Sequence, residues 1–468
     1  MLHTTILSRL REMPETRRYW VAYSGGMDSH GLLDAMARLG GDLEGAGISA
    51  IHVNHRLQPE ADRWARHASA VCDNLGIACR VLMADARAAP GESPEAAARR
   101  ARYGVIKEIV GADEILLTAH HLDDQAETLF LQMVRGAGPR GLAGMPGVAR
   151  FGAGWLGRPL LGVPRRVLGE YARSRGLSWI EDGSNGDYRF DRNYLRHEIL
   201  PRLRDRWPGI TRTLGRVAAH QADIARQLEE LATSDLEDPH GDDHMEPLVT
   251  PVCERGREAP DIAARSALHG GTLSCDRLRR LPEYRQRNVL TAWFRRLGLP
   301  IPNAIHIRQI LVEVVGAAPD REPLVGWKGA QVRRYRDNLY ASPPPLAHDP
   351  AQVIHWSLDE PLFLSHGGLK ARRVLGTGLR AAACPGDRVE VRFRRGGECC
   401  RLMARGHARS LKKLFQERGV VPWARDRNPL IFVAGELAAV AGLWVCHPFA
   451  ANRDEPGWAL QWTPIISR

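Results

Sequence analysis

Short apolar runs alternate with helical patterns from residue 19 to residue 134, and this alternation constrains the fold most. The apolar runs cover residues 19–23, 48–54, 79–83 and 115–119, and the helical patterns cover 28–39, 60–75, 93–110 and 123–134. Strands that alternate with helices form a parallel sheet with helices on both faces. Ligands bind at the carboxyl ends of the strands in such sheets. We therefore expect an α/β domain whose functional residues directly follow its strands.

The first apolar run leads into the sequence SGGMDS, residues 24–29, at the start of a helical pattern. Paired glycines let the backbone approach a phosphate, which the free N–H groups of a helix N-terminus then bind. A carboxylate at Asp28 repels phosphate unless a Mg²⁺ ion bridges the two. The pattern lacks the Gly-Lys-Ser/Thr of a Walker A loop. We predict a nucleotide phosphate site formed by Ser24, Gly25, Gly26, Met27, Asp28 and Ser29.

The loop resembles the SGGxDS loop of the N-type ATP pyrophosphatases. The resemblance implies a Rossmann-like catalytic fold that uses ATP and Mg²⁺. It also implies cleavage of ATP to AMP and pyrophosphate, with transfer of the adenylyl group to an acceptor. The loop alone does not identify that acceptor.

A second polar cluster, TAHHLDDQAET at residues 118–128, follows the run at 115–119. Asp123 could simply cap the helix, but capping explains one acid and not the group. Carboxylates in this position suit either a Mg²⁺ ion, with Asp124 as a second ligand, or a cationic co-substrate. The candidate catalytic residues of this cluster are His120, Asp123, Asp124 and Glu127.

A third pattern places Glu95, Arg99 and Arg102 on one face of the helix expected at 93–110. A solvent-exposed stripe of ion pairs explains the spacing as well as a functional role does. Arg99 and Arg102 are nonetheless candidates, because a guanidinium can support an oxygen on which negative charge develops.

Taken in order, these motifs resemble those of the tRNA(Ile)-lysidine synthetases. The resemblance rests on SGGMDS, HVNHRL (52–57), ESPEAAARRARY (92–103), TAHHLDDQAET followed by RGAGPRGLAGM (135–145), RPLL (158–161) and LKKLFQERGVVPWARDRNPL (411–430). It covers the first 205 or so residues densely, the last 90 or so in patches, and residues 215–345 poorly.

The resemblance implies a two-step reaction. ATP adenylates the C2 oxygen of the wobble cytidine in a tRNA(Ile) with a CAU anticodon, and free L-lysine then displaces AMP to give lysidine. The phosphate loop and Mg²⁺ would stabilise the pyrophosphate leaving group. The acids at 123–127 would bind the lysine ammonium, and a carboxylate or His120 would accept its proton.

Charge is concentrated in two segments of a chain whose formal net charge is +11. Residues 158–216 carry a net charge of +6 and residues 380–427 a net charge of +8. Two basic segments on a near-neutral body are typical of a protein that binds a polyanion. With the resemblance, they predict tRNA contacts at Arg192, Asn193, Arg196, Lys412, Lys413, Trp423 and Arg425.

Composition shifts predict three domains: a catalytic domain at 1–215, a helical tRNA-contacting domain at 216–345 and a small α+β tRNA-binding domain at 346–468. The eight cysteines show no CxxC pair, which gives no indication of a zinc ribbon or redox dithiol. The longest apolar run, 437–445, is about half a membrane span. We expect a cytoplasmic protein without membrane contact, and the sequence leaves a homodimer open. The main alternative is another tRNA-modifying enzyme of the superfamily, such as a cytidine thiolase.

Overall fold

The computed structural model describes residues 2–43, 45–55, 60–87, 93–181, 186–237, 249–250, 271–318, 321–384, 389–403 and 406–464. Arg56 and Leu57 of the HVNHRL motif lie outside these residues. The chain divides into two units, Met1–Gln227 and Leu228–Arg468.

The first unit is built on a six-stranded sheet in the order β3-β2-β1-β4-β6-β5. The strands are β1 (Arg18–Ala22), β2 (Gly47–Asn54), β3 (Ala78–Met83), β4 (Glu114–Leu117), β5 (Val148–Phe151) and β6 (Gly154–Gly157). All neighbours are parallel except β5 and β6, which form an antiparallel pair at one edge. The parallel sheet predicted from the alternation is confirmed, and its four predicted strands match β1 to β4.

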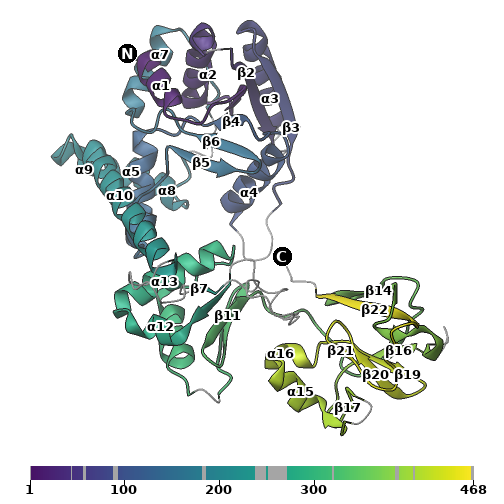
Figure 1. Ribbon diagram of the computed structural model, residues 1–468. Helices are drawn as coiled ribbons and strands as arrows, with labels where there is room; N and C mark the ends of the chain where they lie inside the picture. The colour runs from purple at the N-terminus through teal and green to yellow at the C-terminus, as the bar shows by residue number, and fades with distance from the viewer. Residues whose placement is uncertain are drawn as a thin grey trace. The chain divides into compact units, whose positions relative to one another are not determined.

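Helices cover both faces of this sheet (Figure 1). Along β1, Tyr19 and Val21 join one buried cluster and Trp20 joins another, as the two-residue period of a strand requires. The first cluster packs against α1 (Leu2–Arg11), α2 (Met27–Leu39), α3 (Ala61–Asn74) and α7 (Arg165–Ser174). The second packs against α4 (Pro94–Lys107). The remaining helices before residue 150 are α5 (Leu122–Val134) and the two short helices η1 (Gly40–Asp42) and α6 (Pro139–Leu142).

A buried carboxylate joins α2 to α7. Asp34, 2% exposed, accepts hydrogen bonds from the Tyr171 hydroxyl at 2.6 Å, Arg38 Nε at 3.2 Å and Arg175 Nε at 3.4 Å. Removing one partner of a buried network leaves the other groups without the acceptor that offset their desolvation.

We expect Asp34→Ala to lower the free energy of unfolding by about 2–4 kcal/mol, measured by urea denaturation. Glu170→Ala is the matched control, because Glu170 pairs with Arg166 on the solvent side of α7, where both side chains are more than half exposed. An exposed pair contributes about 0–1 kcal/mol. Equal losses for the two variants would contradict the prediction.

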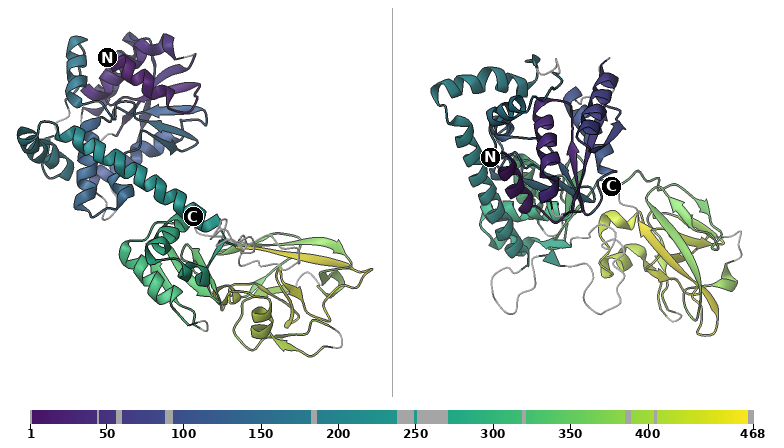
Figure 2. Two further views of the ribbon diagram at one scale, coloured as in Figure 1. Left: turned by 60° about the vertical axis from the view of Figure 1, so that its left-hand side comes forward. Right: turned by 90° about the horizontal axis from the view of Figure 1, so that it is seen from above.

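The basic stretch after α7 forms α8 (Asp191–Tyr194), the π-helical turn η3 (Leu195–Ile199), α9 (Leu200–Arg206) and α10 (Ile210–Glu237). Pro201 stands at the start of α9. Proline has no N–H to donate and its ring clashes with the preceding turn, so a widened turn before it relieves the conflict. The 28-residue α10 spans the boundary between the two units as one helix (Figure 2).

The start of the second unit contains the expected helices together with a five-stranded sheet. The helices are α12 (Cys275–Arg280), α13 (Glu283–Arg296), α14 (Ala304–Gln309) and η4 (Ile310–Val315). The sheet has the order β7-β8-β11-β10-β9, with β7 (Val249–Thr250), β8 (Thr272–Ser274), β9 (Leu324–Trp327), β10 (Ala330–Tyr335) and β11 (Asn338–Ser342). The helices and the sheet share one buried cluster, centred on Trp293 and Phe294.

The rest of the second unit is mainly antiparallel sheet. One sheet runs β12-β16-β19-β20-β21, another β13-β14-β22-β15, and β17 pairs with β18. The bounds are β12 (Ile354–His355), β13 (Leu362–Leu364), β14 (Gly367–Leu375), β15 (Leu379–Arg380), η5 (Ala381–Ala383), β16 (Val389–Arg392), β17 (Cys399–Cys400), β18 (Arg409–Ser410), α15 (Leu411–Glu417), α16 (Pro422–Arg425), β19 (Leu430–Val433), β20 (Glu436–Val440), β21 (Trp444–Val445) and β22 (Pro456–Pro464). The α+β character predicted for this part is confirmed.

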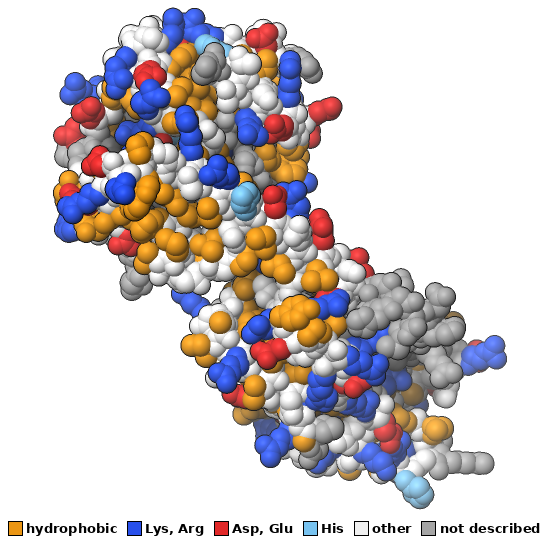
Figure 3. All heavy atoms as spheres, turned by 90° about the vertical axis from the view of Figure 1, so that its left-hand side faces the viewer, with side chains coloured by type: hydrophobic (Ala, Val, Ile, Leu, Met, Phe, Trp, Pro, Cys, Tyr) orange, Lys and Arg blue, Asp and Glu red, His pale blue; other side chains and the backbone are white. Residues whose placement is uncertain are grey.

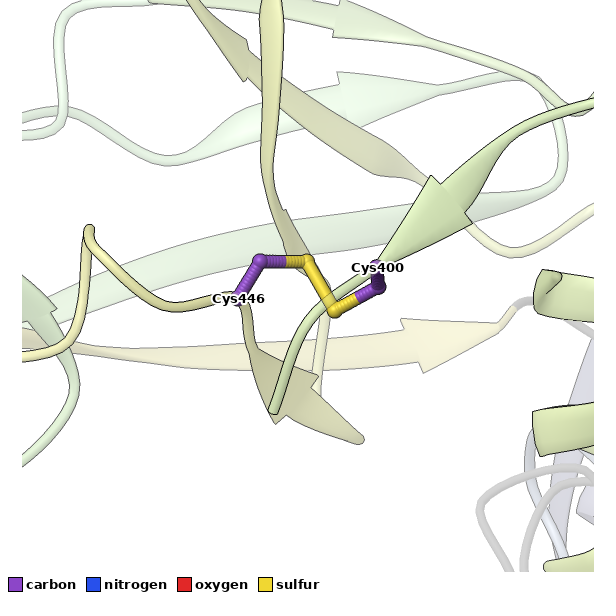
Figure 4. Close-up of a disulfide and its surroundings, with 2 residues drawn as sticks. All are labelled: Cys400 and Cys446. Carbon is purple, nitrogen blue, oxygen red and sulfur yellow. A yellow bond between two sulfur atoms is a disulfide. The ribbon is translucent and has the colours of Figure 1, made fainter. Parts of the chain in front are cut away.

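The adjacent cysteines near residue 400 have different environments. Cys400 forms a disulfide with Cys446, and both residues are 2% exposed within the cluster that packs α15 against β19 and β20 (Figure 4). Cys399 is exposed and carries a free thiol. The bond therefore joins β17 to the segment that follows β21.

Two histidines pack against the ring of Phe393 in the C-terminal sheets. His366, 4% exposed, lies 4.5 Å from His348 between ring centroids and 5.3 Å from Phe393. Burial and the neighbouring His348 lower the pKa of His366 to about 4. The folded protein therefore holds His366 neutral.

We expect the stability of the second unit to decrease as the pH falls from about 6.5 toward 4. His366 takes up a proton near pH 6.5 when unfolded but only near pH 4 when folded, so acid favours the unfolded chain by up to about 3 kcal/mol. Urea unfolding at several pH values should show a smaller acid slope for His366→Gln. The exposed His355 is the control, and His355→Gln should keep the wild-type slope. Identical slopes for all three proteins would contradict the assignment.

No helix within the described ranges has both the length and the hydrophobicity needed to cross a bilayer.

Candidate functional site

The SGGMDS loop wraps around the start of α2. Gly25 has φ +88°, a conformation that glycine adopts without strain, and Gly26 is the N-cap residue of α2. The Ser24 and Ser29 hydroxyl oxygens lie 3.0 Å apart, and Ser29 Oγ donates to the Gly26 carbonyl at 2.9 Å. The Ile180 N–H donates to the Gly25 carbonyl at 3.0 Å, which ties the loop to the segment around residue 180. The first turn of α2 is thus presented beside glycine backbone, as binding of a phosphate requires.

Asp28 lies in the first turn of α2 with one oxygen free for a cation. Its Oδ2 lies 3.4 Å from Arg165 Nε and 3.7 Å from His121 Nε2, whereas its buried Oδ1 has no hydrogen-bond partner among the described residues. Burial opposes ionisation, but the nearby imidazole N–H of His121 and the charge of Arg165 outweigh it and lower the pKa of Asp28. An ionised carboxylate with a free oxygen fits a Mg²⁺ ligand.

The start of α5 forms the second part of the site. His121 is the N-cap residue: its Nδ1 accepts from the Asp124 N–H at 3.3 Å, and Asp124 Oδ2 accepts from the His121 N–H at 2.9 Å. With Nδ1 as the acceptor, Nε2 carries the hydrogen and points toward Asp124 Oδ2 at 3.3 Å. His121 therefore links the carboxylates of Asp28 and Asp124. His121 belongs to the TAHHLDDQAET motif but was not predicted as a site residue, although a histidine just before the helical acids Asp123 and Asp124 could have indicated a cap.

Two arginines neutralise the buried acids of α5. Arg192 Nε donates to Glu127 Oε2 at 2.7 Å, and Arg196 Nε donates to Glu127 Oε1 at 2.7 Å. Both guanidinium groups also reach Asp124 Oδ1, at 3.0 Å and 3.2 Å. The side chain of Glu127 is 1% exposed and that of Asp124 is 11% exposed. Burial opposes ionisation of Asp124, but the imidazole N–H of His121, the charge of Arg192 and the hydrogen bond from the His121 backbone N–H outweigh it and lower its pKa.

Two further arginines, which were not among the predicted site residues, complete this charge balance. The Arg165 N–H donates to Asp123 Oδ2 at 2.8 Å while its guanidinium lies beside Asp28. Arg204 donates to Asp123 Oδ1. Nothing in the spacing of the sequence pairs residue 123 with residues 165 and 204, because the contact depends on where α7 and α9 pack.

His120 lies at the carboxyl end of β4 and is held neutral. Its Nδ1 lies 2.8 Å from the Thr118 hydroxyl. Burial lowers its pKa to about 3, and the nearby guanidinium groups of Arg158, Arg192 and Arg99 act in the same direction. A group with such a low proton affinity is a weak base near pH 7.

The two arginine candidates on α4 have separate surroundings. Arg102 Nε donates to His55 Nε2 at 3.3 Å, next to the polar end of β2. Burial and the Arg102 charge lower the pKa of His55 to about 4, so this histidine is neutral and can accept that bond. Arg99 stacks over the ring of Tyr103, 4.9 Å from its centroid. Both arginine residues are exposed, although burial around the guanidinium group lowers the pKa of Arg102.

The glycine-rich stretch after α5 is fixed by Gln125. The Met145 N–H donates to Gln125 Oε1 at 2.7 Å, and Gln125 Nε2 donates to the Met145 carbonyl at 3.0 Å. Gly144 has φ +65°, and a Cβ atom there would lie 2.7 Å from Gln125 Oε1. The loop therefore returns to α5 beside the acidic cluster.

The candidate tRNA contacts in the second unit differ in accessibility. Lys412 and Lys413 are exposed on α15. Trp423 is half-buried, with its ring 5.4 Å from that of Tyr340. Arg425 is 8% exposed and donates to the Val420 carbonyl at 2.8 Å, which is a structural contact.

Many arginines of the basic segment at 158–216 are paired with acidic side chains, although the segment has a net positive charge. Among the described residues, eight of its thirteen arginines form ion pairs: Arg165, Arg166, Arg175, Arg189, Arg192, Arg196, Arg202 and Arg204. On the face drawn in Figure 3, Lys and Arg side chains lie among acidic and apolar ones. The charge of this segment therefore serves the internal structure of the unit as well as its surface.

Comparison with known families identifies the three parts of the chain. Residues 2–203 match the PP-loop domain, residues 273–340 match the TilS substrate binding domain, and residues 389–462 match the TilS substrate C-terminal domain. The relatives span the whole chain: the tRNA(Ile)-lysidine synthase of Methylococcus capsulatus is 42% identical over 457 residues, 95% of this chain and 96% of the relative. The chain belongs to the tRNA(Ile)-lysidine synthase family.

Two further tRNA(Ile)-lysidine synthases show the same full-length agreement. The protein of Coxiella burnetii is 37% identical and covers 98% of this chain and 96% of its own length. The protein of Pseudomonas aeruginosa is 38% identical and covers 99% of this chain and 97% of its own length. The resemblance drawn from the sequence motifs is thereby confirmed, including residues 215–345, where the motifs were sparse.

Proposed function

We infer that this chain is an ATP-using ligase that forms lysidine in tRNA(Ile). The observation that carries the inference is a PP-loop directly beside a buried acidic cluster, within a chain that matches the lysidine synthases from end to end. The proposed substrates are ATP, free L-lysine and a tRNA(Ile) with a CAU anticodon. Lysine would be joined to C2 of the wobble cytidine, with release of AMP and pyrophosphate.

The PP-loop would bind ATP through its phosphates. Ser24, Gly25, Gly26, Met27 and Ser29 offer backbone N–H groups and hydroxyls at the start of α2. Asp28 would hold a Mg²⁺ ion, which supplies positive charge to the pyrophosphate group as it leaves. Asp124 is a poorer second ligand in the described state, because both of its oxygens already accept hydrogen bonds.

The acids of α5 would receive the amine of lysine. Glu127 and Asp124 are buried carboxylates, so their attraction for an ammonium group is weakly screened. Asp123 lies beside these two acids and accepts hydrogen bonds from the Arg165 backbone N–H and from the Arg204 guanidinium group. The low pKa of His120 leaves it little basicity, so it is a poor acceptor for the lysine proton. Arg99 and Arg102 would approach the cytidine oxygen on which charge develops.

Binding of tRNA would use residues from both units. Lys412 and Lys413 are exposed cations that suit phosphate, and Trp423 offers a partly exposed ring for stacking. Arg192, Asn193 and Arg196 would contact tRNA from the first unit, whereas Arg425 would act by holding α16. We propose catalytic, middle and C-terminal domains at 1–215, 216–345 and 346–468, and a cytoplasmic location. A homodimer stays a prediction.

The same fold suits a cytidine thiolase less well. Thiolation needs reactive cysteines near the nucleotide site, and Cys72 is fully buried in the core between α2, α3 and the sheet. Cys79, on β3, packs against the same core.

The decisive experiment supplies the purified protein with ATP, Mg²⁺, labelled lysine and a CAU-anticodon tRNA(Ile) transcript. Label should enter the tRNA with AMP and pyrophosphate released in equal amounts. A transcript with a different wobble base is the control and should stay unlabelled. Tight tRNA binding without lysine transfer would contradict the proposed function.

A further inference from the structure

The guanidinium groups of Arg192 and Arg196 occupy the acceptors that the ammonium group of lysine needs. Both oxygens of Glu127 accept from these arginines, at 2.7 Å to 2.9 Å. Asp124 Oδ1 accepts from both arginines, and Asp124 Oδ2 accepts from His121. An ammonium group brings three donors, and each requires an acceptor once the group is buried. In the described state all four carboxylate oxygens are engaged.

Charge leads to the same conclusion as hydrogen bonding. The site pairs Asp28 with Arg165, Asp123 with Arg204, and Asp124 and Glu127 with Arg192 and Arg196. Four carboxylates and four guanidinium groups leave no net negative charge to attract another cation. A buried ammonium group without a compensating anion is strongly unfavourable. Lysine therefore requires the departure of a cation or the arrival of an anion.

The two arginines lie in a segment where an α-helical turn passes directly into a π-helical turn. Arg192 lies on α8, and Arg196 lies in the π-helical turn η3, which holds five residues before the proline-containing start of α9. π-Helical turns are rare and occur often at functional sites. Each arginine side chain is 25% exposed, so solvent and ligands reach it from one side.

We propose that Arg192 and Arg196 form a phosphate-operated gate over the lysine site. Phosphate groups of tRNA or ATP would draw the two guanidinium groups from Asp124 and Glu127, and the freed carboxylates would then bind the ammonium group of lysine. This inference rests on the proposed function and adds an order to it, in which phosphate binding precedes lysine binding. In this proposal Arg192 and Arg196 pair with carboxylates in the free protein and with phosphate groups in the complex.

The gate is tested by lysine affinity, measured by equilibrium dialysis of labelled lysine against the full-length protein. Three states are compared: protein alone, protein with a non-hydrolysable ATP analogue, and protein with the CAU-anticodon transcript. We expect lysine to bind at least ~10-fold more tightly in one of the two phosphate-containing states, a coupling within the usual range for linked sites. The state that shows the gain identifies the phosphate source.

The double variant Arg192→Gln/Arg196→Gln should bind lysine without any phosphate ligand and should lose the gain. Arg202→Gln is the matched control, because it removes one charge from the same segment at a residue whose ion pair, among the described residues, is with Glu198 at the surface. Arg196→Lys keeps the charge without the forked geometry and should weaken the gate in part. Thermal unfolding of each variant shows whether it is folded.

The outcomes separate the gate from the proposed function. Wild-type protein that transfers lysine to tRNA but binds it equally well in all three states overturns the gate alone. Wild-type protein that fails to transfer lysine overturns the proposed function instead. The wild-type comparison decides the question even if the double variant does not fold.

Discussion

Asp28→Asn should abolish adenylation of the tRNA while leaving tRNA binding intact. The substitution keeps the shape of the side chain but removes the negative charge beside the PP-loop, where the free Oδ1 atom fits a Mg²⁺ ligand. Loss of one strong electrostatic contact to a leaving group typically costs about 10²- to 10³-fold in rate. We expect a loss of at least ~10²-fold in pyrophosphate release, measured in single-turnover reactions with saturating tRNA.

Two comparisons make this result specific. Asp42→Asn changes an exposed acid beyond the far end of α2 and should leave the rate unchanged. Mn²⁺ in place of Mg²⁺ should restore part of the lost activity if the variant weakens metal binding. A wild-type rate of pyrophosphate release from Asp28→Asn would remove Asp28 from the catalytic site.

Glu127→Gln should separate the two chemical steps. The substitution removes the buried carboxylate that would hold the lysine ammonium, but it lies on α5 and leaves the loop around Asp28 unchanged. We expect pyrophosphate release without lysine to persist, while lysine transfer falls by about 10²-fold or more. The measurement follows both products in the same reaction, pyrophosphate for the first step and labelled tRNA for the second.

Glu108→Gln is the control for this variant, because Glu108 is an exposed acid at the end of α4. A fold check is needed, since Arg192 and Arg196 lose a charged partner in Glu127→Gln. If both steps decline together in a stably folded variant, Glu127 serves the site as a whole and not the lysine alone.

The sequence predicted the parts of the fold that depend on local pattern. The four central strands and the helices between them follow from apolar runs and helical periods, and Ser93 caps α4 as its sequence indicates. The β5–β6 edge and the sheet of β7 to β11 were missed. Their strands are two to six residues long, which is too short for a two-residue alternation to be distinguished from a buried turn.

The same limit applies to the site. Glycine pairs and clustered acids are visible in the sequence, so the PP-loop and the α5 cluster could be predicted residue by residue. The partners of those acids could not be, because Arg165, Arg192, Arg196 and Arg204 lie 42 to 81 residues away in the chain. Their net charge suggested nucleic acid, whereas the packing of α7, α8 and α9 turns them toward carboxylates.

The hydrogen bonds between Gln125 and the backbone of Met145 hold the glycine-rich loop against α5. The loop therefore tolerates a side chain at some glycine positions and not at others. No atom lies within 4 Å of the Cβ position at Gly138, whereas residue 144 has no room for a side chain while Gln125 holds the loop. Among related sequences, residues 125 and 144 should therefore vary together, and residue 138 should vary independently. A library of variants sorted for activity would recover that pairing as a correlation between two sites 19 positions apart.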